Sequence, residues 1–230
     1  MSAGPLAHRR RTPLRRLLEE KGAAWTSIGD AAVAGAFQEG SDPGHLAIAD
    51  LSPLPRLGFK GRGTIEAMRK RGIVVEATPN RSYRQDDGSL CLVLAPGEVM
   101  LLSNLKGDGA RLEALQIGWR LEDGERTYPL LRRDSHAWLA VTGSEAPSLF
   151  AKLCAVDLRT AKFPDLAIAQ TSVARMSAIV ARADIGAVPC YHVLADSAAA
   201  LYFCSCLLDA AHEFGGGMIG LEAVQDLRRS

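Results

Sequence analysis

The sequence predicts an α+β fold of two pseudo-symmetric halves, and this prediction rests on two internal matches and on the order of elements around them. The segment RLGFKG at 56–61 matches WLAVTG at 138–143, 82 positions later (57 to 139). The segment LVLAP at 92–96 matches HVLAD at 192–196, 100 positions later (93 to 193). Each copy combines short apolar strands, a glycine that ends one of them and a helical stretch. A duplicated β-rich unit with helices on its faces is therefore expected.

We expect a single unit over residues 1–230, divided into an N-terminal half at about 1–117 and a C-terminal half at about 118–230. A chain of 230 residues is long enough for two small halves that share a core. Its composition, with 47% hydrophobic and 23% charged residues, is that of an ordinary soluble globular protein.

In the first half, local signals predict helices separated by short strands and turns. Thr12 is a suitable N-cap and Pro13 a suitable first helical residue, so a helix is expected to run to residue 21. Residues 29–44, rich in Gly, Ala and Asp, predict a loop or a weak strand, and the polar run 79–88 predicts a turn or a mobile hairpin tip. Strands are expected at 45–49, 56–60, 74–78, 90–94 and 99–102, and further helices at 64–71 and 108–116.

In the second half, Asp123-Gly124 is a hairpin signal between predicted strands at 119–122 and 127–131. Ser144 is expected to cap a helix over 145–153. The apolar residues of 197–214 follow the helical period, which predicts the longest helix, ended by three glycines at 215–217. The remaining strands are expected at 137–141, 173–180 and 191–194.

Charge and cysteine content limit the function classes. The net charge is +1, from 27 basic and 26 acidic residues, which predicts no nucleic-acid or membrane surface for the molecule as a whole. Five arginines between 9 and 16 indicate a solvated helix entrance, or else a contact with an acidic partner. No apolar run approaches the roughly 18 residues of a membrane span, and the N-terminus lacks the apolar region of a secretory signal. Five cysteines, an odd number, indicate reduced thiols and a cytoplasmic location.

Few residues suggest chemistry directly. The five histidines are scattered without ligand spacing, so no metal site is expected. Asp134, Ser135 and His136 are adjacent, and neighbours on a strand point to opposite faces, so they are not expected to form a triad. Asp86-Asp87-Gly88 fits a simple turn, although it could also place a carboxylate as a ligand anchor. No catalytic residue is predicted.

Several segments resemble one family. The strings SLCLVLAPGEVMLL (89–102), AWLAVTGSEAPSLFAKLCAVDL (137–158), FPDLAIAQTSVARMSAIVARA (163–183) and ALYFCSCLLDAAHEFG (200–215) resemble the gamma subunit of heterotetrameric sarcosine oxidase, as does DLSPLPRLGFKGRG (50–63). That subunit belongs with the folate-binding domain of the glycine-cleavage T-protein, the aminomethyltransferase. TPLRRLLEEKGAAW (12–25) and IGLEAVQDLR (219–228) are similar to T-protein segments. The resemblance implies two halves of antiparallel sheet with helices, related by a pseudo-dyad, around a central channel where the enzymes hold folate.

The same resemblance bears on site residues. Asp87, and Arg228 in the segment IGLEAVQDLR, are the positions that match folate-binding residues of the T-protein. The T-protein's Gly-Tyr-Thr-Gly-Glu segment has no counterpart, and 183–186 (ADIG) stands near its place. The Ala-Arg-Asp of the T-protein is Ala-Val-Gln at 223–225, so one anion-pairing arginine is absent. A pterin needs a carboxylate held in bidentate geometry, so the lost Glu argues against folate chemistry by this chain alone.

Three hypotheses remain open. The chain is a non-catalytic gamma-like subunit that stabilises a sarcosine-oxidase-type amine-oxidising complex. Its partners would then be larger flavin-containing subunits, with no cofactor in the chain itself. Alternatively, it is a stand-alone aminomethyl or methyl transferase-like protein that binds tetrahydrofolate through Asp87 and Arg228. The third hypothesis is a self-associating scaffold that kept the fold and lost the ligand.

Overall fold

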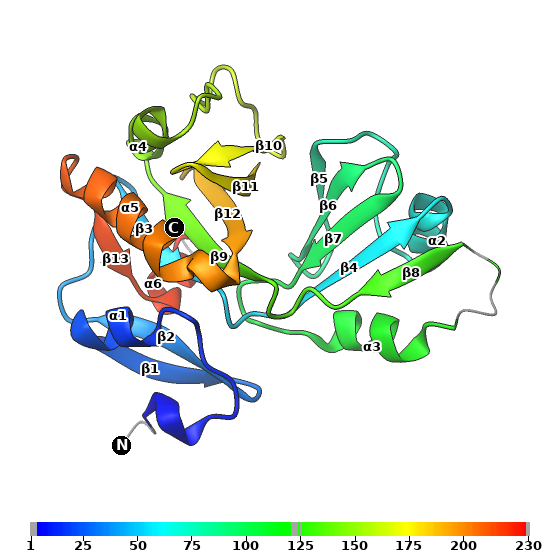
Figure 1. Ribbon diagram of the computed structural model, residues 1–230, viewed down its shortest axis with the longest axis horizontal. Coiled ribbons are helices and arrows are strands. Elements are labelled where there is room, and N and C mark those ends of the chain that lie inside the picture. Colours follow the sequence, from blue (N-terminus) through cyan, green and yellow to red (C-terminus); the bar gives the residue numbers. More distant parts are fainter. Residues whose placement is uncertain (1–3, 121–123, 125, 229–230) are drawn as a thin grey trace.

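A computed structural model describes residues 4–120, 124 and 126–228 and contains two large sheets and one separate hairpin (Figure 1). The larger sheet has six strands in the order β10-β11-β12-β9-β3-β13, and the smaller has five in the order β5-β6-β7-β4-β8. All neighbours are antiparallel except β13 and β3. The strands are β1 (Ala23–Ile28), β2 (Ala31–Phe37), β3 (Ala47–Asp50), β4 (Arg56–Gly61), β5 (Arg81–Arg84), β6 (Leu90–Ala95), β7 (Glu98–Leu102), β8 (Thr127–Leu130), β9 (His136–Thr142), β10 (Ile168–Val173), β11 (Met176–Arg182), β12 (Cys190–Asp196) and β13 (Gly217–Ile219).

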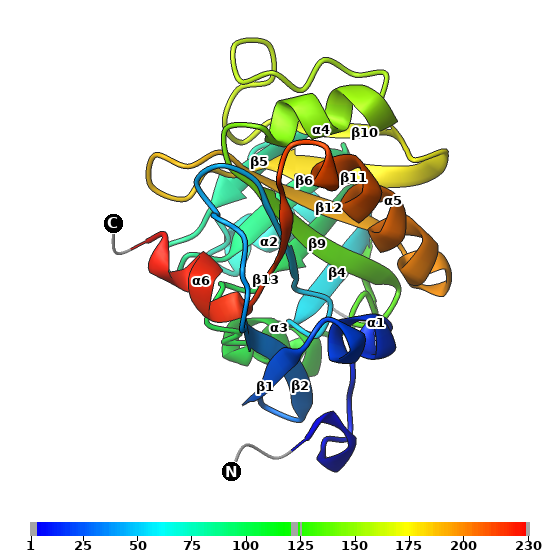
Figure 2. The same cartoon turned by 90° about the vertical axis from the view of Figure 1, so that its left-hand side faces the viewer.

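Helices cover the outer face of each sheet. The helices are α1 (Arg15–Glu20), α2 (Thr64–Lys70), α3 (Ala110–Gly118), α4 (Ala146–Leu153), α5 (Ala200–His212) and α6 (Leu221–Asp226), with 3-10 turns η1 (Pro5–Ala7) and η3 (Ser197–Ala199). Phe150 of α4 and Phe203 of α5 pack on the six-stranded sheet in one apolar cluster. Met68 of α2 and Leu112 of α3 pack on the five-stranded sheet in another. Figure 2 shows α6 beside β13, above the β1–β2 hairpin. The predicted α+β class is confirmed.

A third apolar cluster lies between the inner faces of the two sheets. It joins Leu92 and Met100 of the smaller sheet to Trp138 and Leu194 of the larger sheet. The edge strands also meet, because Ser82 N donates to Leu166 O at 2.8 Å and Ile168 N to Asn80 O at 2.9 Å. The sheets therefore share one core and are hydrogen-bonded along one side.

The repeat is visible as a shared hydrogen bond. Gly61 ends β4 and donates to Gly97 O at 2.8 Å, and Gly143 follows β9 and donates to Pro189 O at 3.0 Å. Helices α2 and α4 start at positions 64 and 146, which keep the same spacing of 82. The match of 92–96 with 192–196 is wrong as a structural equivalence. Strand β12 pairs with β9, and the strand that pairs with β4 in the same way is β7. The structural equivalent of β12 is therefore β7 and not β6.

Two strands are exchanged between the halves. Strand β3 precedes β4 in the chain but pairs with β9, and β8 precedes β9 but pairs with β4. Each sheet therefore takes one strand from the neighbouring part of the sequence. This interleaving ties the segments on either side of residue 117 to one another through backbone hydrogen bonds.

Several predicted elements differ from the structure. The helix predicted from Thr12 begins at Arg15, although Thr12 Oγ1 accepts from Leu14 N at 3.1 Å. Residues 31–37 form β2, and 81–84 form β5. No strand forms over 74–78, and the strand predicted over 173–180 is a hairpin of β10 and β11. The N-cap of α4 is Glu145 and not the predicted Ser144, and Asp123 of the predicted turn lies outside the described residues.

Candidate functional site

The two predicted folate-binding positions meet at the β5–β6 turn. Gly88, with φ 81°, occupies this turn directly after Asp87. Arg228 follows α6, and its Nη2 lies 3.4 Å from the carbonyl oxygen of Gly88. The structure therefore brings Arg228 against the loop that carries Asp87. Both side chains are on the surface, and a folate contact at either position stays a prediction.

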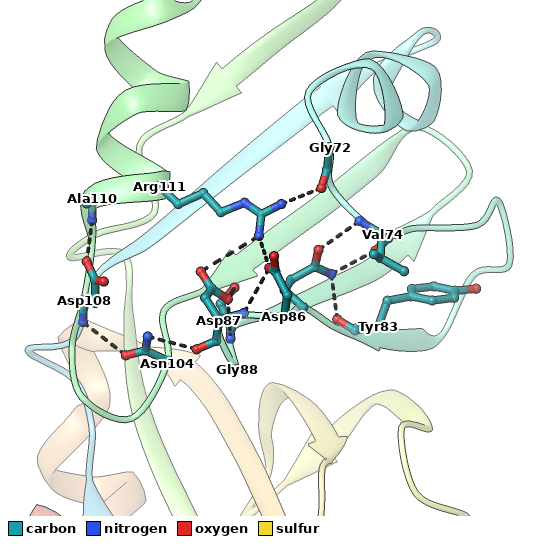
Figure 3. Close-up of polar contacts among 12 residues, drawn as sticks. Gly72, Val74, Tyr83, Asp86, Asp87, Gly88, Asn104, Asp108, Ala110 and Arg111 are labelled. Carbon is teal, nitrogen blue, oxygen red and sulfur yellow. Dashed lines mark hydrogen bonds and ion pairs between the residues drawn. The ribbon is translucent and has the colours of Figure 1, made fainter.

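The carboxylate of Asp87 is already used by its own loop (Figure 3). Its Oδ1 accepts from Ser89 N at 2.8 Å and from Ser89 Oγ at 2.5 Å. Its Oδ2 lies 3.9 Å from Arg111 Nη1, which pairs more closely with Asp86 at 2.8 Å. A hydrogen bond from Asp87 N, followed by the Arg111 guanidinium, lowers the pKa of Asp86. This geometry is that of a turn held by side chains, as the turn interpretation of 86–88 expects.

Neighbouring polar groups brace the same hairpin. The Gln85 side chain accepts a hydrogen bond from Val74 N at 2.8 Å and donates one to Val74 O at 2.9 Å. The backbone groups of Val74 therefore bond to a side chain and not to a neighbouring strand. Asn104 Nδ2 donates to Asp87 O at 3.1 Å. Fixed on three sides, the 86–88 turn keeps one orientation towards Arg228.

The carboxylate near the place of the missing Glu is also occupied. Asp184 accepts two hydrogen bonds from Arg182, at 2.8 and 2.6 Å, in bidentate geometry. Arg84 of β5 donates to Asp184 O at 2.8 Å and pairs with Asp165 at 3.1 Å. These contacts fasten β5 to the larger sheet. They leave Asp184 as a structural acid, and bidentate pairing with a pterin would require it to leave Arg182.

Aromatic and polar side chains fill the space between the sheets. Trp138 Nε1 donates to His192 Nδ1 at 3.1 Å, and the rings lie 5.7 Å apart. Burial, with smaller effects from Arg84 and Arg228, lowers the pKa of His192 to about 4. Burial also raises the pKa of the adjacent Cys190 thiol to about 12. His192 is therefore neutral, Cys190 is an unreactive thiol, and the pair serves packing.

A hollow of about 400 Å³ remains on the inner face of the larger sheet. Register places Gln170, Ile179, Leu194 and Trp138 in one row across β10, β11, β12 and β9. The first three of these line the hollow together with Ser177 and His136, and Gln170 Nε2 donates to Leu94 O of the smaller sheet at 2.6 Å. This volume and mixed lining suit a small ligand. Asp87 and Arg228 are not among its lining residues.

Ser135 and His136 are closer than the sequence predicts. Ser135 precedes β9, so strand alternation does not separate the two side chains, and Ser135 Oγ lies 2.7 Å from His136 Nδ1. Asp134 instead pairs with Arg10 at 2.7 Å. Burial, then Arg132 and Arg56, lower the pKa of His136 to about 4. These three residues are therefore not arranged as a nucleophile, base and orienting acid.

Within the described residues, no three His, Cys, Asp or Glu side chains gather as a metal site would require. Over the same residues, no helix has the length and apolar character to cross a bilayer.

Comparison with known proteins identifies the fold. No protein-family model and no curated protein sequence matches the chain. Among solved structures, it is similar to the glycine cleavage system aminomethyltransferase T from Bartonella henselae, with a TM-score of 0.72 and 15% identity over 95% of this chain. It spans 62% of that enzyme's length. It is also similar to a chain of the heterotetrameric sarcosine oxidase from Corynebacterium sp. U-96, with a TM-score of 0.66 and 21% identity, covering 89% of this chain and 96% of that one.

The fold that the sequence resemblance implied is thereby confirmed. The chain has the fold shared by aminomethyltransferase T and this sarcosine oxidase chain.

Proposed function

We propose that the chain is a non-catalytic, gamma-like subunit of a hetero-oligomeric amine-oxidising complex of the sarcosine oxidase type. The observation that carries this proposal is the share of each similar chain that this chain covers. The chain corresponds to 96% of a chain of a heterotetrameric sarcosine oxidase but to only 62% of aminomethyltransferase T. A unit that matches nearly the whole of one subunit is the right size to occupy that place in an assembly. Its partners would be larger subunits that carry flavin, in the cytoplasm.

The state of the acidic side chains supports a structural role. Asp87 is bound by Ser89, and Asp184 is bound by Arg182. The centre of the molecule is packed with Trp138 and Leu194. Such a chain offers a partner shape and surface, and few free groups for acid–base chemistry.

Two exposed apolar groups are the surfaces that a partner would cover. Ile117 lies in α3, Tyr128 in β8 and Leu131 just after β8, and Leu201 and Tyr202 lie on α5. All five are exposed, and Leu131 has the largest exposed fraction among them, at 73%. Large apolar side chains that stay exposed are candidates for contact with a partner. Strand β8 is also an edge strand of the smaller sheet.

The test is purification of the tagged full-length chain from its native cells, followed by native mass spectrometry and absorbance spectroscopy. We expect stoichiometric recovery of a larger subunit that contains flavin. Leu131→Glu and Leu201→Glu are matched variants on the two surfaces, and at least one of them should release the partner. Recovery of the chain alone, at a monomer or homodimer mass, would refute the proposal and favour a self-associating scaffold.

The alternative is a chain that binds tetrahydrofolate by itself, and the hollow on the inner face of the larger sheet favours it. Isothermal titration of the isolated chain with tetrahydrofolate decides between the two. Binding that is lost in Asp87→Ala and Arg228→Ala but kept in Arg16→Ala would support the predicted residues. Binding lost in Ser177→Trp, which fills the hollow, would place the ligand there, and no saturable binding would exclude the alternative.

A further inference from the structure

A second hollow, of about 320 Å³, lies where the two halves meet and has no part in the proposed function. Four segments far apart in the sequence surround it: residues 10–13, the turn at 52–56 before β4, the connection 134–136 into β9, and the start of η3 at 197–198. At roughly 30 Å³ per water molecule, it has room for about ten waters or one small molecule.

The charges that line this hollow are unbalanced. Arg10, Arg11 and Arg56 face a single acid, Asp134. Asp134 is paired with Arg10 at 2.7 Å. Arg11, which is exposed, makes no ion pair or hydrogen bond with any described residue. Two positive charges are therefore left over among the lining side chains.

Arg56 is the buried member of this group, with 4% of its surface exposed. Its Nη2 donates to Arg133 O at 2.7 Å and to His136 O at 2.8 Å, and its Nε to Arg132 O at 3.3 Å. Its Nη1 has no partner among the described residues. Buried charged donors without a partner are rare and unfavourable, so this guanidinium is fixed in place with one donor still to be satisfied.

Burial and neighbouring charges set the charge states of the groups around this hollow. Burial lowers the pKa of Arg56 only to about 10, so it stays protonated at neutral pH. Burial also raises the pKa of the nearby acid Asp50, and the charge of Asp50 in turn raises that of Arg56. Among the causes that lower the pKa of His136, which lines both hollows, are the cations Arg132 and Arg56.

We propose that this hollow, here called the arginine cavity (lined by Arg10, Arg11, Arg56, Ser52, His136 and Ser197), binds a small dianion, either a phosphate group or a dicarboxylate. Guanidinium groups bind both through paired charge-assisted hydrogen bonds. The lining side chains carry two more positive charges than negative ones, which suits a dianion, and Arg56 is held in a fixed position in the wall by its backbone hydrogen bonds. The proposal does not depend on the role of the chain in a complex.

Isothermal titration at low ionic strength tests it, with inorganic phosphate and succinate as separate probes of the full-length protein. We expect one saturable site for at least one probe, and the probe that binds identifies the source of the dianion. Arg11→Gln removes a free charge without touching the core, and should weaken binding roughly three- to tenfold, because this side chain is exposed and partly screened. Arg11→Lys should keep most of the affinity.

Two further variants make the test decisive. Ala198→Glu, at an exposed lining position, places a carboxylate at the cavity and should abolish binding. Arg16→Gln makes the same change in net charge on α1, at a residue that does not line the cavity, and should leave binding unchanged. No saturable binding of either probe, or equal weakening by Arg11→Gln and Arg16→Gln, would overturn the proposal, the second result because it would show attraction by net charge alone.

Discussion

Gly143→Ala and Gly61→Ala test whether the repeat is a structural equivalence. Gly143 has φ 107° and Gly61 has φ 150°, a region that side chains other than glycine rarely adopt. A Cβ at position 143 would lie 2.8 Å from Leu46 N and still closer to His45 O. A Cβ at position 61 would lie 2.7 Å from Thr127 Cα and still closer to the backbone oxygen before it. In each case the added Cβ meets backbone atoms at or just before the start of an exchanged strand, β3 for position 143 and β8 for position 61. Backbone atoms cannot rotate away as a side chain can.

The expected cost follows from these contacts. The segment before β3 must move away, which weakens the two backbone hydrogen bonds that it accepts beside position 143: Ser144 N to Gly44 O and Glu145 N to His45 O, each 3.0 Å. At about 1 kcal/mol per hydrogen bond and about 1–3 kcal/mol of backbone strain, the free energy of unfolding should fall by about 3–5 kcal/mol. For a protein of this length, each kcal/mol corresponds to roughly 2–4 °C in Tm, so a fall of about 6–20 °C is expected.

Urea and thermal unfolding followed by circular dichroism measure this change. Gly118→Ala is the matched control, because Gly118 lies at the exposed end of α3 with no atom within 4 Å of an added Cβ. It should be neutral or stabilise by about 0.5–1 kcal/mol, since alanine favours a helix. A loss below about 1 kcal/mol for Gly143→Ala would contradict the packing argument, and a large loss at one glycine without the other would contradict the equivalence of β4 and β9.

Buried groups elsewhere give three further predictions. His192 has a pKa of about 4 in the folded protein against an ordinary value of 6.5. Its contribution to stability is therefore unchanged above pH 6.5, and the free energy of unfolding falls by about 3 kcal/mol as the pH drops from 6.5 towards 4. Urea titrations at several pH values should show a shallower fall in His192→Gln. Tyr191→Phe removes the 2.7 Å hydrogen bond to Leu158 O and should cost about 1 kcal/mol in the same assay, and an unchanged urea midpoint would count against that bond. Phe203→Ala should cost about 3–5 kcal/mol, because α5 packs on the larger sheet through this fully buried ring, and a cost near zero would mean that α5 is loosely held.

Elements with local signals could be predicted from sequence, and those defined by distant contacts could not. The segments 56–71 and 137–153 combine an apolar strand, a terminal glycine and a helix, so both copies were expected where β4–α2 and β9–α4 lie. The sequence left 29–44 open between a loop and a weak strand because Ala and Gly have weak strand propensity, and the burial of β2 there is set by α6 packing on it. The β10–β11 hairpin was read as one strand because its turn places Ala174 and Arg175 at positive φ without Asn or Gly.

The site residues also divide into those with a local sequence signal and those whose role depends on distant contacts. Asp86-Asp87-Gly88 suggested both a turn and a ligand anchor, and only the positions of Ser89 and Arg111 show how the carboxylates are used. The run of arginines between 9 and 16 includes Arg10 and Arg11, but nothing in the sequence joins them to Arg56, which reaches the cavity from β4. The exchange of β3 and β8, which brings these segments together, depends on pairing across more than 60 residues (61 to 127).

This exchange also limits where a ligand can enter. Because β3 and β8 cross between the halves, and β5 is bonded to the segment before β10, the two sheets cannot part as rigid bodies without breaking backbone hydrogen bonds. The core between them is closed by Trp138 and Leu194. A ligand would therefore enter at the rim, where the two hollows share His136.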